Sequence, residues 1–201
     1  MKKMTDIIWY NELDSTNLQA IRDKENVDKM SVIAAKHQTA GKGQGDHIWL
    51  SPADENLMFT ITLKYGPEGF MDNINVSNEV LISHVTAITV TQVLAAHGID
   101  SRVKLPNDIY VGMKKICGIL IKHTLKGKYL TDSIIGIGLN VNQTVFDPNL
   151  PNPTSMKIES KENYNIDSLL NEFLGLFVQN MFHMEEVSRA LPELLLKVQK
   201  P

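Results

Sequence analysis

Two apolar runs on either side of Lys126-Gly127 constrain the fold of this 201-residue chain most strongly. Residues 115–123 and 129–139 are rich in isoleucine and leucine, and glycine between such runs is typical of a tight turn. The pattern predicts a β-hairpin with antiparallel strands. A chain with such a hairpin is neither a purely helical bundle nor a strict repeat of parallel strand–helix–strand units.

The other expected elements mix helices and strands. Residues 78–97 are the longest helical candidate, followed by Gly98 where a helix C-terminus favours glycine. Thr16 and Gln19 have capping-box spacing and predict a helix that ends near Asp23. We therefore predict an α+β fold, a mixed β-sheet with helices packed mainly on one face. The remaining expectations are strands at 7–10, 31–36, 56–63 and 101–104, a loop at 147–155, a helix at 167–184, and a helix at 186–198 kinked or begun at Pro192.

Composition excludes several classes of protein. Hydrophobic residues make up 43% of the chain, which is enough for a packed core, and the net charge of −3 argues against a general nucleic-acid binder. Cys117 is the only cysteine, so a disulfide framework and a zinc site built from cysteine pairs are excluded. The N-terminal residues lack the apolar core of a signal peptide, and no apolar run reaches membrane-spanning length. We expect a cytoplasmic protein without nucleic-acid or membrane partners.

Common catalytic signatures are missing from the sequence. There is no phosphate-binding P-loop motif and no Gly-x-Ser-x-Gly motif, and residues 41–46 are one glycine short of a dinucleotide-binding pattern. The six histidines include no pair four residues apart with a glutamate between, so a histidine zinc site is not expected.

Two polar segments in the first quarter of the chain are candidates for binding. Residues 14–17 (Asp-Ser-Thr-Asn) either cap a helix or hydrogen-bond a neutral polar group of a ligand. Residues 38–49 contain three alternating glycines, Lys42 and Trp49. They form either a flexible surface loop or a concavity in which backbone N–H groups bind an anion.

Two later segments are candidates as well. Residues 104–120 hold a Pro-Asn-Asp turn sequence, but also Asp108 and several lysines, which suit Mg²⁺ and phosphate chemistry. Residues 135–142 read as a strand with two glycines, which is either a bulged core strand or a place of close approach. Asn140 and Asn142 would share one face there and suit a flat polar group.

In this order, the segments resemble the catalytic domain of biotin–protein ligases over roughly residues 5–180. The matching motifs are Ser15-Thr16-Asn17, the glycine-rich loop from Gly41 to Trp49, Lys104 to Asp108, Lys115 to Leu120, Gly136 to Asn142, and Asn152 to Met156.

The resemblance implies an ATP-dependent ligase with Mg²⁺ that activates biotin as biotinyl-5′-AMP. The biotinyl group then passes to a lysine of a biotin carboxyl carrier protein. It also implies a catalytic domain at residues 1–185 and a helical tail at 186–201, without the small C-terminal β domain or an N-terminal helix-turn-helix. A monomer and a homodimer both remain open.

The resemblance also assigns roles to residues. Lys115, Asp108 and Lys42 are the expected catalytic residues, and Asp108 is tied either to Mg²⁺ or to the incoming lysine amine. The biotin-binding set is Ser15, Thr16, Asn17, Gln38, Gly41, Lys42, Gly43, Gln44 and Lys115. The nucleotide-binding set is Trp49, Asn107, Asn140 and Asn142.

Some positions depart from the family pattern. Gln44 stands where many members have arginine, Asp46 where glycine is frequent, and Leu105 where tryptophan is usual. Lys42 replaces an arginine and so loses bidentate hydrogen bonding. These departures motivate one alternative, a non-catalytic module that binds biotin or its carrier. A second alternative is a lipoate or octanoate ligase or transferase of the same fold, although Ser15, Thr16 and Gln38 offer partners for a ureido ring.

Overall fold

A computed structural model describes residues 7–45 and 47–196. Asp46 and the end of the predicted last helix lie outside the described residues. The chain divides into two compact units, which are described separately. The first unit is Met1–Glu79 with Ile119–Gly138, and the second is Val80–Gly118 with Leu139–Pro201.

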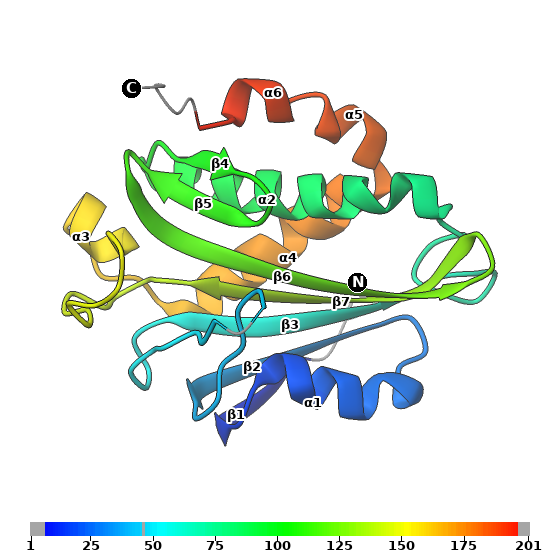
Figure 1. The fold of residues 1–201 in the computed structure, drawn as a ribbon, viewed down its shortest axis with the longest axis horizontal. Helices are drawn as coiled ribbons and strands as arrows, with labels where there is room; N and C mark the ends of the chain where they lie inside the picture. Colours follow the sequence, from blue (N-terminus) through cyan, green and yellow to red (C-terminus); the bar gives the residue numbers. More distant parts are fainter. Residues whose placement is uncertain (1–6, 46, 197–201) are drawn as a thin grey trace. The chain divides into compact units, whose positions relative to one another are not determined.

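Seven strands form one mixed sheet in the order β1-β2-β3-β7-β6-β5-β4 (Figure 1). β1 and β2 are parallel, whereas the pairs β2/β3, β4/β5 and β5/β6 are antiparallel. The predicted α+β class and mixed sheet are therefore confirmed. The predicted hairpin is β6 and β7, joined through Gly127, whose φ of 62° suits glycine. The strands are β1 (Ile7–Leu13), β2 (Met30–Gln38), β3 (Leu57–Lys64), β4 (Arg102–Lys104), β5 (Asp108–Val111), β6 (Lys114–Lys126) and β7 (Tyr129–Leu139).

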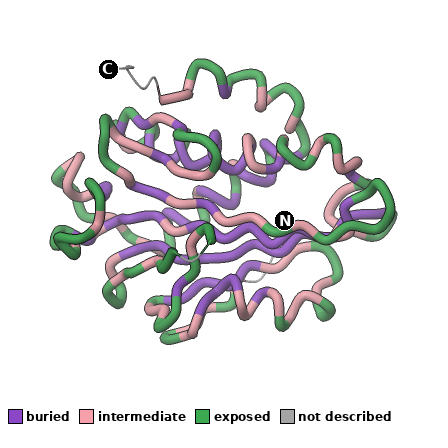
Figure 2. Tube along the Cα trace, in the orientation of Figure 1, coloured by how far each residue is buried: buried purple, intermediate pink, exposed green. Residues whose placement is uncertain are grey.

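In the first unit, helix α1 (Thr16–Asp23) connects β1 to β2 and packs on the sheet through Ala20, against Ile33 and Ile134. Figure 2 shows β3 buried along most of its length, and the middle of β2, residues 32–35, is buried as well. The predicted helix is confirmed, but the capping box is wrong. Ser15, not Thr16, is the N-cap, and it makes no side-chain cap hydrogen bond. Gln38 Oε1, at the end of β2, accepts from the Thr16 N–H.

In the second unit, helices α2 (Glu79–Ala96) and α4 (Ile166–Phe182) are joined by a buried amide. Asn180 Nδ2 donates to Thr89 Oγ1 (2.9 Å) and to Gln92 Oε1 (2.7 Å). Gly98 has a φ of +72°, as the predicted helix end requires.

One helical span in the described part of the chain, Val76–Ala96, is long and apolar enough to cross a membrane. The expectation that no run reaches this length is therefore wrong. A core helix passes the same test, and 56% of the apolar window is buried within the structure. The span is weak evidence for a membrane segment.

The structure of the second unit differs from the sequence-based expectations at three places. The turn at 105–107 is followed by a strand, β5, that was not expected. The predicted single last helix is replaced by two short helices, α5 (Met184–Ser188) and α6 (Leu191–Leu194), with Pro192 in the first turn of α6. A further helix, α3 (Met156–Ser160), follows the proline-rich loop and is capped by the Ser155 side chain.

Candidate functional site

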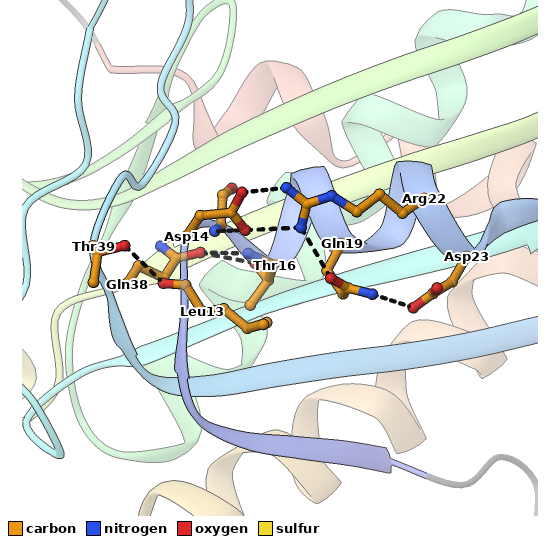
Figure 3. A network of polar contacts seen from close by, with 9 residues as sticks. Leu13, Asp14, Thr16, Gln19, Arg22, Asp23, Gln38 and Thr39 are labelled. Atoms are coloured by element: carbon orange, nitrogen blue, oxygen red, sulfur yellow. Dashed lines mark hydrogen bonds and ion pairs between the residues drawn. The ribbon is translucent and has the colours of Figure 1, made fainter.

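Four uncharged side chains meet in the first unit and form what we call the neutral cluster: Thr16, Asn17, Gln38 and Thr60. Gln38 is the last residue of β2, and its Oε1 lies 2.7 Å from Thr16 N and 3.1 Å from Thr16 Oγ1 (Figure 3). Thr60 Oγ1, on β3, lies 2.9 Å from Thr16 Oγ1. The cluster thus joins the start of α1 to two strands.

The direction of each hydrogen bond in the neutral cluster follows from one backbone group. The N–H of Thr16 only donates, so the Gln38 atom beside it is the carbonyl oxygen. Thr16 Oγ1 therefore donates its proton to the same oxygen, and Thr60 donates to Thr16. The Gln38 amide is left with its two Nε2 protons, for which the acceptor among the described residues is the weak thioether of Met58 at 3.5 Å.

Asn17 adds an unused amide to the neutral cluster. Asn17 is 4% exposed, yet within the described residues neither Oδ1 nor Nδ2 has a hydrogen-bond partner. A Cβ on Gly136 of β7 would lie 2.9 Å from Asn17 Nδ2, so this glycine makes room for the amide. A buried polar group without a partner costs free energy unless a ligand satisfies it.

The glycine-rich loop leaves the neutral cluster directly after Gln38. Gly43 N donates to His47 O (2.8 Å), Trp49 N donates to Gly41 O (3.1 Å), and Lys42 pairs with Ile48 in an antiparallel bridge. The loop is therefore folded back as a narrow hairpin. The predicted anion concavity loses two of its N–H groups to these bonds, while Lys42 and Gln44 remain exposed.

Trp49 is held by the second glycine of β7. A Cβ on Gly138 would lie 2.5 Å from Trp49 Cε2, so the indole ring lies directly on this backbone. On the other arm of the hairpin, a Cβ on Gly41 would lie 2.4 Å from Trp49 O. In β7, Gly136 lies close to Asn17 and Gly138 lies close to Trp49, which favours close approach over a bulged strand as the reason for this glycine pair.

The second unit contains a charged pair between β6 and β5. Lys115 Nζ lies 2.6 Å from Asp108 Oδ1, with side chains 33% and 20% exposed. Next to them, burial raises the pKa of the Cys117 thiol far above its usual range. This thiol is thus a neutral core group rather than a nucleophile.

The backbone of Lys115 is fixed by residues 152–154. Lys115 N donates to Asn152 O (2.8 Å), and Thr154 N donates to Lys115 O (2.9 Å). Thr154 is fully buried, and its hydroxyl contacts Glu159, which also lies 3.6 Å from Lys114. The Asn152–Met156 motif of the sequence therefore supports the strand that carries Lys115.

Both asparagines after β7 are engaged within the second unit. Asn140 Nδ2 donates to Thr154 O (2.9 Å). Asn142 binds the backbone of Tyr164 at both ends of its amide, with Nδ2 donating to the carbonyl (2.8 Å) and Oδ1 accepting from the N–H (2.9 Å). Both side chains therefore stabilise the local backbone, and their predicted contact with a nucleotide stays a prediction.

A magnesium site is not preformed in the described part of the chain. No group of three acidic, histidine or cysteine side chains comes together there, and Asp108 Oδ1 is paired with Lys115. These residues fit a Mg²⁺ ion that arrives on ATP phosphates with at most one protein carboxylate, rather than a dedicated metal cage.

The structure brings together Thr16, Asn17 and Gln38 in one unit, and Lys115 and Asp108 in the other. Ser15 is buried at the helix N-cap, and Asn107 lies in the turn before β5. Sequence reasoning missed Thr60, because a threonine in a strand resembles ordinary strand composition. It also missed Arg22, whose partner Asp14 is eight residues away and outside the usual helical pair spacing.

Fold and side chains together define a class: α+β domains with a mixed sheet, a glycine-rich loop after β2, and a buried site of uncharged polar groups. The chain belongs to the Biotin/lipoate A/B protein ligase family, whose match covers residues 10–140.

Named relatives agree with this assignment. The bifunctional ligase/repressor BirA of Bacillus subtilis is 30% identical over 139 residues, which are 68% of this chain but 41% of that protein. The biotin–[acetyl-CoA-carboxylase] ligase of Paracoccus denitrificans is 27% identical over 81% of this chain and 66% of its own length. The biotin protein ligase of Leishmania major in complex with biotinyl-5-AMP is 25% identical, with a TM-score of 0.72 over 98% of this chain and 85% of that one.

Proposed function

We propose that this chain is an ATP-dependent biotin–protein ligase that forms biotinyl-5′-AMP and transfers the biotinyl group to a lysine. The observation that carries the proposal is the neutral cluster, with its unused Asn17 amide. Family membership supports the ligase class, and the Leishmania major relative binds biotinyl-5-AMP.

The chemistry of the neutral cluster matches a urea group. The ureido ring of biotin has one carbonyl acceptor flanked by two N–H donors. Gln38 Nε2 and Asn17 Nδ2 are donors for the carbonyl, and Asn17 Oδ1 is an acceptor for an N–H. The neutral cluster contains no charge, which suits a neutral ligand group.

The same cluster argues against a lipoyl or octanoyl substrate. A fatty acyl chain or a dithiolane ring has no group that hydrogen-bonds well to a buried amide. Leaving each such amide group unsatisfied costs about 1–3 kcal/mol. The lipoate and octanoate alternatives are therefore not favoured.

The reaction needs no nucleophile from the protein. The biotin carboxylate attacks the α-phosphorus of ATP, the bond to the β-phosphate breaks, and pyrophosphate leaves. The amine of the acceptor lysine then attacks the carbonyl of the mixed anhydride, AMP leaves, and one proton is released. Mg²⁺, when bound to ATP, neutralises phosphate charge.

We assign Lys115 to the negative charge that develops on the carboxyl and α-phosphate oxygens, and Asp108 to the amine proton of the acceptor lysine. Lys115 Nζ and Asp108 Oδ1 lie 2.6 Å apart, and the two residues lie on neighbouring strands of one unit. We assign a biotin-binding role to four residues of the glycine-rich loop, Gly41, Lys42, Gly43 and Gln44, and to Ser15, which precedes Thr16. Trp49, Asn107, Asn140 and Asn142 are assigned to the nucleotide.

The partner in this proposal is a biotin carboxyl carrier protein, and the place of action is the cytoplasm. The name of the Paracoccus denitrificans relative specifies acetyl-CoA carboxylase as the protein modified. The chain spans 41% of the length of the Bacillus subtilis relative. We propose residues 1–185 as the catalytic domain, although this boundary falls inside α5.

The test is pyrophosphate release from MgATP with biotin, lipoate or octanoate as the acid. Release with biotin alone is expected, followed by labelling of a carrier domain. Release with lipoate or octanoate would move the protein to the other branch of the family. Biotin binding by calorimetry without pyrophosphate release would identify a non-catalytic binding module.

A further inference from the structure

Asp14, in the turn between β1 and α1, makes hydrogen bonds to three segments of the first unit. Its Oδ1 accepts from Ser15 N (2.7 Å) and from Arg22 Nη1 (3.0 Å), and its Oδ2 contacts the second guanidinium nitrogen (Figure 3). Its backbone oxygen accepts from Ala40 N (2.8 Å). One residue thus holds the start of α1, the body of α1 and the start of the glycine-rich loop.

Arg22 is oriented from the opposite side by its own helix. Its Nη1 also donates to Gln19 Oε1 (3.0 Å), and Gln19 Nε2 donates to Asp23 Oδ2 (2.8 Å). The guanidinium therefore meets the carboxylate in the two-bond arrangement that gives arginine its geometric specificity. The side chains of Arg22 and Asp14 are 50% and 36% exposed, so dissolved salt screens this pair.

The turn held by Asp14 also carries the groups that we assign to biotin. Thr16 and Asn17 follow Asp14 along the chain. Thr39 N donates to Leu13 O (2.8 Å), one residue before Asp14. Gly41 comes next in the loop and packs against Gln38, where an added Cβ would lie 3.0 Å from Nε2. A shift of this turn would displace both the neutral cluster and the loop.

We propose that the Asp14–Arg22 ion pair is a positioning element that sets the affinity of the neutral cluster for its neutral ligand group. Neither residue touches the ligand in this scheme. The inference rests on the proposed function, because it takes the ligand group to be the ureido ring. The ion pair acts through the turn, so its loss weakens binding while leaving the groups around Lys115 unchanged.

The first experiment uses biotinamide, a neutral probe whose binding involves no ligand carboxylate. Arg22→Gln and Asp14→Asn are each expected to raise its Kd about fivefold. Raising the salt from about 0.02 M to 0.5 M is expected to weaken binding to the wild type by a similar factor, and to leave both variants unchanged. In the adenylation reaction, KM for biotin rises while kcat stays the same.

Three further variants separate positioning from general stability. The double variant Asp14→Asn with Arg22→Gln should bind like either single variant, because both remove one interaction. Arg22→Lys keeps the charge but loses the second bond, so its Kd should fall between those of the wild type and Arg22→Gln. Glu25→Gln removes an exposed pair with Lys24 (3.7 Å) just beyond the same helix and should leave Kd unchanged.

Amide hydrogen exchange of residues 39–41 in the ligand-free protein tests the inference without any ligand. Faster exchange in Arg22→Gln and Asp14→Asn, but not in Glu25→Gln, is expected. Unchanged exchange and unchanged affinity in both variants would overturn the inference. A wild type that fails to bind biotinamide, while both variants speed exchange, would overturn the proposed function and keep the positioning role.

Discussion

The neutral cluster and the Lys115–Asp108 pair solve different chemical problems with different surroundings. In the neutral cluster, Thr16 and Asn17 are each 4% exposed and Thr60 is fully buried. Lys115 and Asp108 keep between a fifth and a third of their surface in contact with solvent. Recognition of an uncharged group depends on hydrogen bonds without competing water, whereas isolated charges are expensive to bury.

Replacing Lys115 should abolish the chemistry assigned to the Lys115–Asp108 pair and leave binding at the neutral cluster intact. Lys115→Ala is expected to lower biotin-dependent pyrophosphate release by about a thousandfold or more, since it removes the charge assigned to the transition state. Biotinamide affinity should be nearly unchanged, because the neutral cluster is intact. Calorimetry and pyrophosphate release on the same preparation check both statements.

Lys114→Ala is the matched control, because Lys114 precedes Lys115 on β6 and pairs with Glu159 at 3.6 Å. Its pyrophosphate release should stay within about threefold of the wild type, as expected for an exposed ion pair. Equal losses in the two variants would contradict the role of Lys115.

Adding a methyl group to β7 at Gly138 should have the next largest effect, on the packing of Trp49. The Cβ of Gly138→Ala would lie 2.5 Å from Trp49 Cε2, so the indole ring must move. We expect a loss of about 1–3 kcal/mol of stability and a KM for ATP raised about tenfold. Thermal unfolding and steady-state kinetics measure the two effects.

Gly175→Ala on α4 is the control for this change, since nothing lies within 4 Å of its added Cβ. Alanine in a helix should keep or raise the unfolding temperature. A Gly138→Ala protein with wild-type stability and wild-type KM for ATP would disprove the close approach of Trp49.

Changing the Gln38 amide to a carboxyl tests whether the neutral cluster binds its ligand through the Nε2 donor. Gln38→Glu keeps an oxygen acceptor for Thr16 but replaces the Nε2 donor, so the Kd for biotinamide is expected to rise about tenfold or more at pH 7. As pH falls toward the ordinary glutamate pKa of about 4.3, the protonated carboxyl becomes a donor and affinity should partly recover. A Kd that is the same at all pH values would contradict donation by Gln38.

The smallest expected effect concerns acid stability in the first unit. The hydrogen bonds from Arg22 lower the pKa of the Asp14 carboxyl below its ordinary value of 3.8. A lowered folded-state pKa stabilises the fold above pH 3.8, and this contribution disappears as pH falls through the lowered value. The stability difference between wild type and Asp14→Asn should therefore be constant near neutral pH and shrink in acid, measured by urea unfolding.

Much of the fold was predictable because its signals are local. The β6–β7 hairpin and α2 are encoded by apolar runs next to Gly127 and Gly98, where the backbone has a positive φ, and α4 is encoded by its amphipathic pattern. The strand β5 was missed because its four residues follow a strong turn signal. Pro192 marked the break in the predicted last helix, since α6 begins at Leu191, but the separate short helix α5 before it was not predicted.

The polar residues of the site were also visible in the chain, as hydroxyl, amide, lysine and glycine residues in a characteristic order. Which of their atoms remain available for a ligand depends on segments far apart in sequence. Gln38 reaches back 22 residues and uses its Oε1 at the start of α1, which leaves Nε2 facing the weak acceptor Met58. Tyr164 occupies both ends of the Asn142 amide. Side-chain amides have two chemically different ends, and their neighbours in three dimensions determine which end is free to bind.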